Sequence, residues 1–265
     1  MQIRSPKEIA NAADAAGKVK ANLTSNNAFS AKFIGMSFAA GAFIALGGLL
    51  SVVAGYGFPE ASAGNPSLQK MLSGLVFPIG LVLVVVLGAE LFTGNNALLI
   101  PGMMRRDIRP SAVLKNWTLV WIGNFAGALA MAYFLTYLAG ITASDPYHSA
   151  IIRMAETKAT LPWWVIFVRG IGANWCVCLA VWLAMAGNTL TEKVAGCWIP
   201  VAAFVILGYE HCVANMFFIP AGMLEGADVT IYTMTVGNLI PATLGNITGG
   251  ALFVGTLHGY LRLKG

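Results

Sequence analysis

Charged residues are scarce in this chain. Only 10% of its 265 residues are Asp, Glu, Lys or Arg, whereas 57% are hydrophobic, and the mean hydropathy is +0.73. A soluble domain carries about 25% charged residues, so the composition indicates a membrane protein with several spans. The formal charge of +5 does not indicate nucleic-acid binding, because the basic residues are dispersed among connecting segments instead of forming one stripe.

Patterns typical of disulfide frameworks and metal sites are also missing. The four cysteines are Cys176, Cys178, Cys197 and Cys212, all within apolar stretches. They form neither a CxxC motif nor a Cys/His metal spacing. We therefore expect small, reduced, apolar thiols, with no metal and no cofactor. No signal peptide is visible, because the first apolar run is long enough to span a bilayer.

Six hydrophobic runs approach the roughly 20 residues that a bilayer requires. We place these spans at residues 31–54, 69–103, 113–139, 162–186, 195–223 and 233–261. They predict one membrane domain over residues 31–265. Residues 1–30 are expected to hold a separate cytoplasmic amphipathic helix, because Ser5 and Glu8 fit a capping box with Pro6 at the first helical position. This helix would lie on the membrane face or pack on a neighbouring subunit; a mobile gate is the alternative.

A polar signature, Gly-x-Glu-x4-Asn, interrupts the second and the fifth span. The two copies are Gly88, Glu90 and Asn95, and Gly208, Glu210 and Asn215. An acidic side chain at membrane depth is costly and marks a functional path by default. We expect each of these spans to consist of a half-helix, an unwound segment (residues 207–215 in the second copy) and another half-helix, because glycine accommodates a chain that leaves helical geometry.

The repeat extends beyond the two breaks. A Gly-Asn-x-x-Gly motif follows each one, at Asn124 and again at Asn246. The chain thus has two related halves of three spans each, about 31–139 and 162–261. Because an odd number of spans ends on the opposite side of the membrane, the second half must be inverted relative to the first. The predicted fold is therefore an all-α membrane protein with six spans in a 3+3 inverted repeat, whose broken second and fifth helices meet near the midplane.

The distribution of basic residues predicts the orientation. Twelve lie on the side of both termini: Arg4, Lys7, Lys18, Lys20, Lys32, Arg105, Arg106, Arg109, Lys115, Lys193, Arg262 and Lys264. Only Lys70, Arg153 and Lys158 lie on the other side. The positive-inside rule then places both termini in the cytoplasm, in a multi-pass protein of the cytoplasmic (inner) membrane.

Four segments carry a resemblance to a known family. They read AELFTGN and GYEHCVANM at the breaks, ANWCVCLAVW at residues 173–182 and NLIPATLGNITGG at residues 238–250. In this order and at these spacings, they resemble the formate/nitrite transporter family over nearly the whole chain. The resemblance implies an aquaporin-like fold in a homopentamer, with a pore in each protomer for small monovalent anions such as formate, nitrite or hydrosulfide.

The resemblance also assigns residues to the path. His211 matches a histidine at the pore centre, near a threonine of the other break that corresponds to Thr93. Asn174 matches a polar residue that faces a vestibule, and Lys158 matches a vestibular lysine that would attract anions. The apolar constrictions are implied as Phe77 and Phe204 on the periplasmic side, and Leu81 and Phe92 on the cytoplasmic side.

The glutamates are poor candidates for contact with an anion, because a carboxylate would repel it. We expect Glu90 and Glu210 to support the loops by accepting hydrogen bonds from free backbone N–H groups, and Asn95, Asn215, Asn124 and Asn246 to hold loop carbonyls. A protonated His211 could attract an anion and pass it a proton.

The favoured function is a formate channel, with possible coupling to protons through His211. The segment RGIGANW is closer to the nitrite branch of the family, so a nitrite or hydrosulfide channel of the same fold is the alternative. An intramembrane enzyme using Glu210 and His211 is a remote third reading, because no nucleophile–base pair and no HExxH motif is visible. The expected partners are these anions, protons, the bilayer and other copies of the chain, without nucleic acid.

Overall fold

The computed structural model describes residues 3–28 and 30–263, and every regular element in them is helical. Lys264, counted above for orientation, lies outside the described residues. The elements are α1 (Pro6–Asn27), α2 (Ala31–Tyr56), α3 (Pro59–Ala63), α4 (Pro66–Val76), α5 (Ile79–Leu87), α6 (Phe92–Leu98), α7 (Ile100–Met104), α8 (Pro110–Ala130), η1 (Met131–Tyr137), α9 (Tyr147–Thr160), α10 (Trp163–Ala186), α11 (Leu190–Leu207), α12 (Cys212–Leu224), η2 (Thr233–Leu239), α13 (Ile240–Gly250), η3 (Ala251–Thr256) and α14 (Leu257–Leu263).

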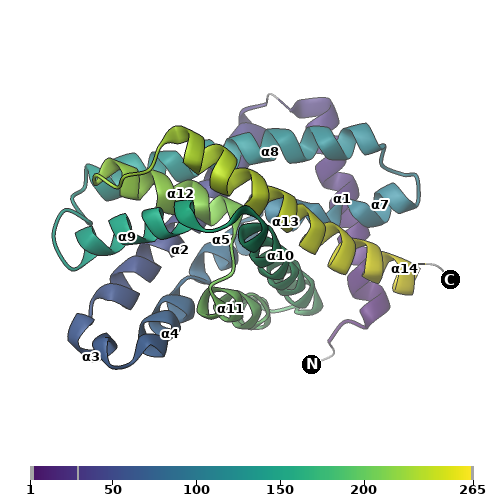
Figure 1. The fold of residues 1–265 in the computed structure, drawn as a ribbon. Helices are drawn as coiled ribbons and strands as arrows, with labels where there is room; N and C mark the ends of the chain where they lie inside the picture. The colour runs from purple at the N-terminus through teal and green to yellow at the C-terminus, as the bar shows by residue number, and fades with distance from the viewer. Residues whose placement is uncertain (1–2, 29, 264–265) are drawn as a thin grey trace.

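Six helical segments among the described residues are long and apolar enough to cross a membrane, which confirms the predicted number. They are Ala31–Tyr56, Ser67–Leu87, Pro110–Tyr137, Trp163–Ala186, Leu190–Leu207 and Thr233–Arg262. The elements α9 and α3 lie at one end of the molecule, on the left in Figure 1. The elements α1, α7 and α14 lie at the other end, on the same side as both termini (Figure 1).

Both predicted breaks are present, and a glycine begins each one. Gly88 ends α5 with φ 72° and ψ 32°, and Gly208 ends α11 with φ 71° and ψ 35°. This left-handed conformation is costly for residues with a Cβ and open to glycine. The unwound segments are shorter than expected, because α12 begins at Cys212 and Asn215 therefore lies within a helix.

The two halves use the same close packing. In the first, α2 packs against α8, and Gly127 brings its backbone against Phe38 so closely that a Cβ would collide with it. In the second, α10 packs against α13, and Gly249 is in the same relation to Ile171. Glycines at these positions let the two helix backbones approach. The packing brings the two broken helices together in the interior.

Helix α1 packs on its own membrane domain. The expected capping box is present at Ser5 and Glu8, but the helix does not lie apart from the other spans. Gly17 meets the backbone of Leu98 in α6, and Lys18 forms ion pairs with Asp14 and Asp107. Hydrogen bonding to Lys18 lowers the pKa of the Asp107 carboxyl, so this connection from α1 to the α7–α8 loop stays charged at neutral pH.

Candidate functional site

The two breaks meet at a hydrogen bond between His211 and Thr93. The His211 Nε2 and Thr93 Oγ1 atoms are 3.0 Å apart, although the residues are 118 positions apart in the chain. His211 precedes the first turn of α12, and Thr93 lies in the first turn of α6. Both side chains are almost completely buried, with 2% and 0% exposure. Each half of the chain therefore supplies one member of a polar pair in the molecular centre.

The surroundings of His211 set its tautomer. The backbone N–H of Ala214 donates to His211 Nδ1 at 3.1 Å, so Nδ1 is an acceptor without a proton. A neutral imidazole then carries its proton on Nε2, and Nε2 donates to the Thr93 hydroxyl. Thr93 Oγ1 makes no other hydrogen bond with the described residues, so its own proton can be offered to a ligand. A protonated His211 would carry a proton on Nδ1 as well, so Nδ1 could no longer accept the hydrogen bond from Ala214.

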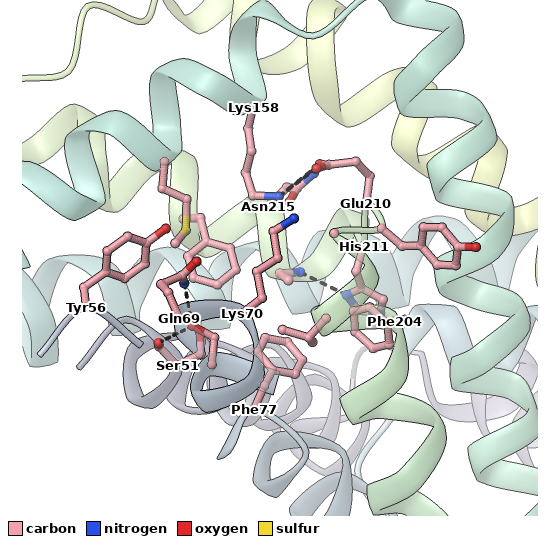
Figure 2. Close-up of a pocket in the computed structure, with 17 residues that line it drawn as sticks. Ser51, Tyr56, Gln69, Lys70, Phe77, Lys158, Phe204, Glu210, His211 and Asn215 are labelled. Carbon is pink, nitrogen blue, oxygen red and sulfur yellow. Dashed lines mark hydrogen bonds and ion pairs between the residues drawn. The ribbon is translucent and has the colours of Figure 1, made fainter. Parts of the chain in front are cut away.

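A cavity of about 180 Å³ leads to His211 from the end of the molecule that carries α9. We call it the α9 mouth and define it by the lining residues Lys70, Phe77, Lys158, Phe204, Glu210 and His211. Phe77 and Phe204 pack edge to face with ring centroids 5.7 Å apart, and the Phe204 ring stacks on the His211 ring. Figure 2 shows the two phenylalanines at the base of this cavity, below His211.

Lys158 does not stand free in the α9 mouth. Its Nζ atom lies 3.0 and 3.1 Å from the two carboxylate oxygens of Glu210, and it also lies over the Phe218 ring. The Asn215 amide donates to the same carboxylate at 2.7 Å and to Asn238 Oδ1 at 2.7 Å. The expectation that Glu210 accepts from free backbone N–H groups is therefore wrong: a lysine and an asparagine side chain occupy its oxygens.

The first break repeats this arrangement with its own residues. Lys20 of α1 approaches Glu90 at 2.8 Å. Asn95 donates to Glu90 at 2.8 Å and to Asn116 Oδ1 at 2.9 Å. The same correction applies to Glu90, whose partners are also side chains. Asn95 and Asn215, expected to hold carbonyls, instead join each glutamate to a second asparagine. Lys20 in α1 thus corresponds to Lys158 in α9.

The backbone of each break is held by a different asparagine. Asn124 accepts from the Phe92 N–H at 2.9 Å and donates to the Glu90 carbonyl at 2.8 Å. Asn246 accepts from the Cys212 N–H at 2.8 Å and donates to the Glu210 carbonyl at 2.9 Å. This agrees with the expected support from Asn124 and Asn246. Unwound backbone in a membrane needs such partners because the bilayer interior has no water to hydrogen-bond its N–H and C=O groups.

A second cavity, of about 440 Å³, opens at the end of the molecule that carries α1. We call it the α1 mouth; its lining includes Arg4, Lys20, Leu81, Glu90, Leu91 and Lys193. Leu81 is one helical turn, about 6 Å, beyond Phe77 of the α9 mouth. Phe92, expected in a ring with Leu81, is not among the residues that line either mouth, and it borders an apolar groove between α8 and α13. A thin apolar layer therefore separates the two mouths.

Asn174 lies in a different place from the expected vestibule. Its side chain is 0% exposed, and its amide donates to the Thr93 carbonyl at 3.2 Å, Asn96 Oδ1 at 3.0 Å and the Asn246 carbonyl at 2.6 Å. These bonds connect α10 to both halves of the site. Asn174 thus braces the backbone behind Thr93 and lines neither mouth.

Sequence reasoning missed the roles of Lys20, Asn116 and Asn238. It places Lys20 in a separate N-terminal helix and singles out neither asparagine. The repeat contains a usable signal for the two asparagines, because Asn116 lies 21 residues after Asn95 and Asn238 lies 23 residues after Asn215. The pairing of Lys20 with Glu90 joins residues 70 positions apart and has no comparable local signal.

Comparison with known sequences supports the resemblance seen in the motifs. A family model described as "Formate/nitrite transporter" matches residues 7–260. The chain is 43% identical to a "Probable formate transporter" of Methanothermobacter thermautotrophicus, over 98% of this chain and 98% of the relative.

Solved structures agree with the fold. An "FNT family ion channel" superposes with a TM-score of 0.86 at 32% identity, covering 96% of this chain and 98% of the other. A "Pentameric formate channel with formate bound" gives a TM-score of 0.76 at 31% identity, covering 88% of this chain and 97% of the other. The predicted six-span helical architecture is thereby confirmed.

Proposed function

This chain belongs to the formate/nitrite transporter family, and we propose that it is a membrane channel for formate, which crosses between the two mouths. The observation that carries the proposal is the buried hydrogen bond between Thr93 and His211. It places one hydroxyl donor at the junction of the two halves, between two cavities that both contain lysines. The names of the similar proteins, a probable formate transporter and a formate channel, favour formate as the anion.

The apolar layer around this pair gives a reason for proton coupling. A bare carboxylate passing between Phe77, Phe204 and Leu81 would lose its hydration, which is far costlier for a charged group than for a neutral acid. We propose that formate accepts a proton through Thr93 when His211 is protonated. The charge of the bound anion would offset the loss of the Ala214 hydrogen bond, because opposite charges favour each other at short range.

The test is uptake of labelled formate into proteoliposomes that contain a pH dye, with protein-free vesicles as the blank. We expect formate entry to acidify the lumen. The variant His211→Phe keeps a ring of similar size and removes the proton carrier, so its formate uptake should lose the linked acidification. Unchanged acidification per formate in that variant would contradict the role of His211, and equal uptake by protein-free vesicles would contradict transport itself.

The identity of the anion is tested by competition. We expect unlabelled formate to compete more strongly than nitrite or hydrosulfide for labelled formate uptake. Stronger competition by nitrite or by hydrosulfide would identify that anion as the preferred cargo of the same pore.

The geometry does not favour an intramembrane enzyme. Thr93 and His211 resemble a nucleophile–base pair at 3.0 Å, but a base must accept the proton of the hydroxyl. Since Nδ1 is occupied by the Ala214 N–H, neutral His211 presents a donor to Thr93 and cannot activate it. The pair is therefore suited to donating a hydrogen bond to a ligand.

We also propose a homopentamer with both termini in the cytoplasm, in a cytoplasmic membrane. The proposed assembly follows the similar formate channel, which is described as pentameric, and the orientation follows the excess of basic residues on the α1 side. Native mass spectrometry should give five chains per particle. Reagents that cannot cross the membrane should label cysteines introduced near α9 from outside the cell, and cysteines near α1 only after lysis.

A further inference from the structure

The α9 mouth contains one lysine that no described acid neutralises. Lys70 of α4 lines this cavity together with Lys158 and Glu210. Figure 2 shows its side chain reaching up from α4 into the cavity, with the ammonium pointing toward the Glu210 and Asn215 side chains. No ion pair connects Lys70 to any described residue. Its charge therefore stays available to an ion in the mouth.

The other lysine of this mouth is already committed. Lys158 and Glu210 lie 3.0 Å apart with 15% and 4% of their side chains exposed, so together they form a nearly neutral pair. The field of such a pair falls off faster with distance than that of a single charge. Lys70 thus supplies the uncompensated positive charge of the α9 mouth.

The α1 mouth repeats this logic with residues from the other half. There Lys20 is paired with Glu90 at 2.8 Å, with 16% and 3% exposure. Lys193 of α11 lines the cavity and forms no ion pair with the described residues; Arg4, which also lines it, donates to the Met185 carbonyl. Lys70 and Lys193 both lie in the first two turns of a broken helix, α4–α5 and α11. Each mouth therefore combines a Lys–Glu pair at one break with a free lysine from the start of the other broken helix.

We propose that Lys70 and Lys193 are the steering residues of the pore, and that each raises the concentration of small anions in its own mouth. This inference rests on the proposed anion transport and adds the residues that set its electrostatics. Lys158 and Lys20 hold the breaks in place through their glutamates. Because the fold is an inverted repeat, each mouth should contain one ion-paired lysine and one steering lysine. The structure contains this combination in both mouths.

The size of the effect follows from Coulomb's law. A unit charge about 10 Å from an anion, at an effective dielectric constant of about 40 to 80, changes the local anion concentration about two- to fourfold. Salt weakens this gain, because the Debye length falls from about 30 Å at 0.01 M to about 8 Å at 0.15 M. Screening applied on one side of the membrane should therefore act only on the cations of that side.

The experiment measures formate permeability at low formate concentration in vesicles of a single protein orientation. Salt of a bulky impermeant anion is raised on one side, and sucrose balances it on the other. For the unchanged protein, we expect salt on either side to lower permeability. Lys70→Gln should lower permeability about two- to fourfold at low salt and abolish the response to salt on the α9 side only. Lys70→Arg, which keeps the charge, should behave like the unchanged protein.

Lys193→Gln should give the corresponding result on the other side: a weaker salt response on the α1 side only, with the remainder owed to Arg4 in the same mouth. The control is Lys115→Gln, which removes a cation of the α1 side that lines neither mouth. An unaltered response to α9-side salt in Lys70→Gln, with formate transport intact, would overturn the inference. Absence of formate transport in the unchanged protein would instead overturn the proposed function, so the two failures are distinguishable.

Discussion

At the scale of single residues, the two buried glutamates are explained by their partners. A carboxylate in a membrane interior is strongly unfavourable when alone, yet Glu90 and Glu210 are only 2% and 3% exposed. Each is held by one lysine and one asparagine. Taking the two charges out of water costs desolvation free energy. Short charge-assisted hydrogen bonds between the lysine and the glutamate offset this cost. Removing one member should therefore be worse than removing both.

This predicts a specific order of stabilities for variants of the Lys158–Glu210 pair. Lys158→Met leaves a buried carboxylate without its cation, which costs about 3–5 kcal/mol. The double variant Lys158→Met with Glu210→Gln leaves no charge and should recover much of that loss. Unfolding temperatures in detergent measure the order. Lys18→Met breaks the exposed pair with Asp107 and leaves the buried Asp14 with its second partner, Arg105, so it should shift the temperature much less.

A double variant as unstable as Lys158→Met alone would contradict this view of the pair.

The resemblance to the family predicted that Thr93 and His211 lie together, and the repeated spacing predicted that Asn124 and Asn246 support the two breaks. Both were insufficient for the hydrogen-bond partners. Asn174 was expected in a vestibule but is fully buried, because its amide N–H group donates to three oxygens at the back of the site. Which oxygens a buried amide reaches depends on the positions of other helices, and no local pattern contains that information.

At the scale of elements, the two broken helices determine where the site can form. Each break is a glycine turn of three further residues, after which a new helix begins at Phe92 or Cys212. Because the unwound turn is short, the first turns of α6 and α12 lie in the interior of the molecule. This places Thr93 and His211 opposite each other, with α1 and α9 supplying the lysines from either end (Figure 1).

The glycines of the breaks should tolerate no side chain, for reasons of backbone conformation alone. An added Cβ at Gly88 meets no atom within 4 Å, but the φ of +72° remains unfavourable. Gly88→Ala should thus destabilise the protein by about 1–2 kcal/mol. The matched control is Gly35→Ala, where space is also open but the residue lies within α2; alanine favours a helix, so stability should stay equal or rise.

Equal unfolding temperatures for Gly88→Ala and Gly35→Ala would show that the left-handed turn contributes nothing.

The number, order and breaks of the spans were predictable because hydrophobic length and glycine position are local properties. The placement of α1 was not. Its amphipathic pattern fits a membrane surface, a neighbouring subunit or its own domain equally well. The structure selects the last, through the approach of Gly17 to Leu98 and the pairing of Lys20 with Glu90.

At the scale of the whole molecule, the inverted repeat gives two similar mouths and one dissimilar centre. The mouths share the Lys–Glu–Asn arrangement and a free lysine each. At the centre the symmetry is absent, because one half offers a hydroxyl and the other an imidazole that donates to it. The overall architecture followed from counting spans, whereas the closed layer between Phe77 and Leu81 could be recognised only from the cavities on its two sides.

The Thr93 hydroxyl provides the most direct test of the account, since it is the donor proposed to meet the anion. Formate uptake by Thr93→Ser and Thr93→Val should be compared with that of the unchanged protein, in vesicles with equal amounts of folded protein. Serine keeps the hydroxyl, so uptake should be largely retained. Valine keeps the shape and removes the donor, which should lower uptake about tenfold or more, as for a lost hydrogen bond to a charged group. Equal uptake by the serine and valine variants would contradict the central claim.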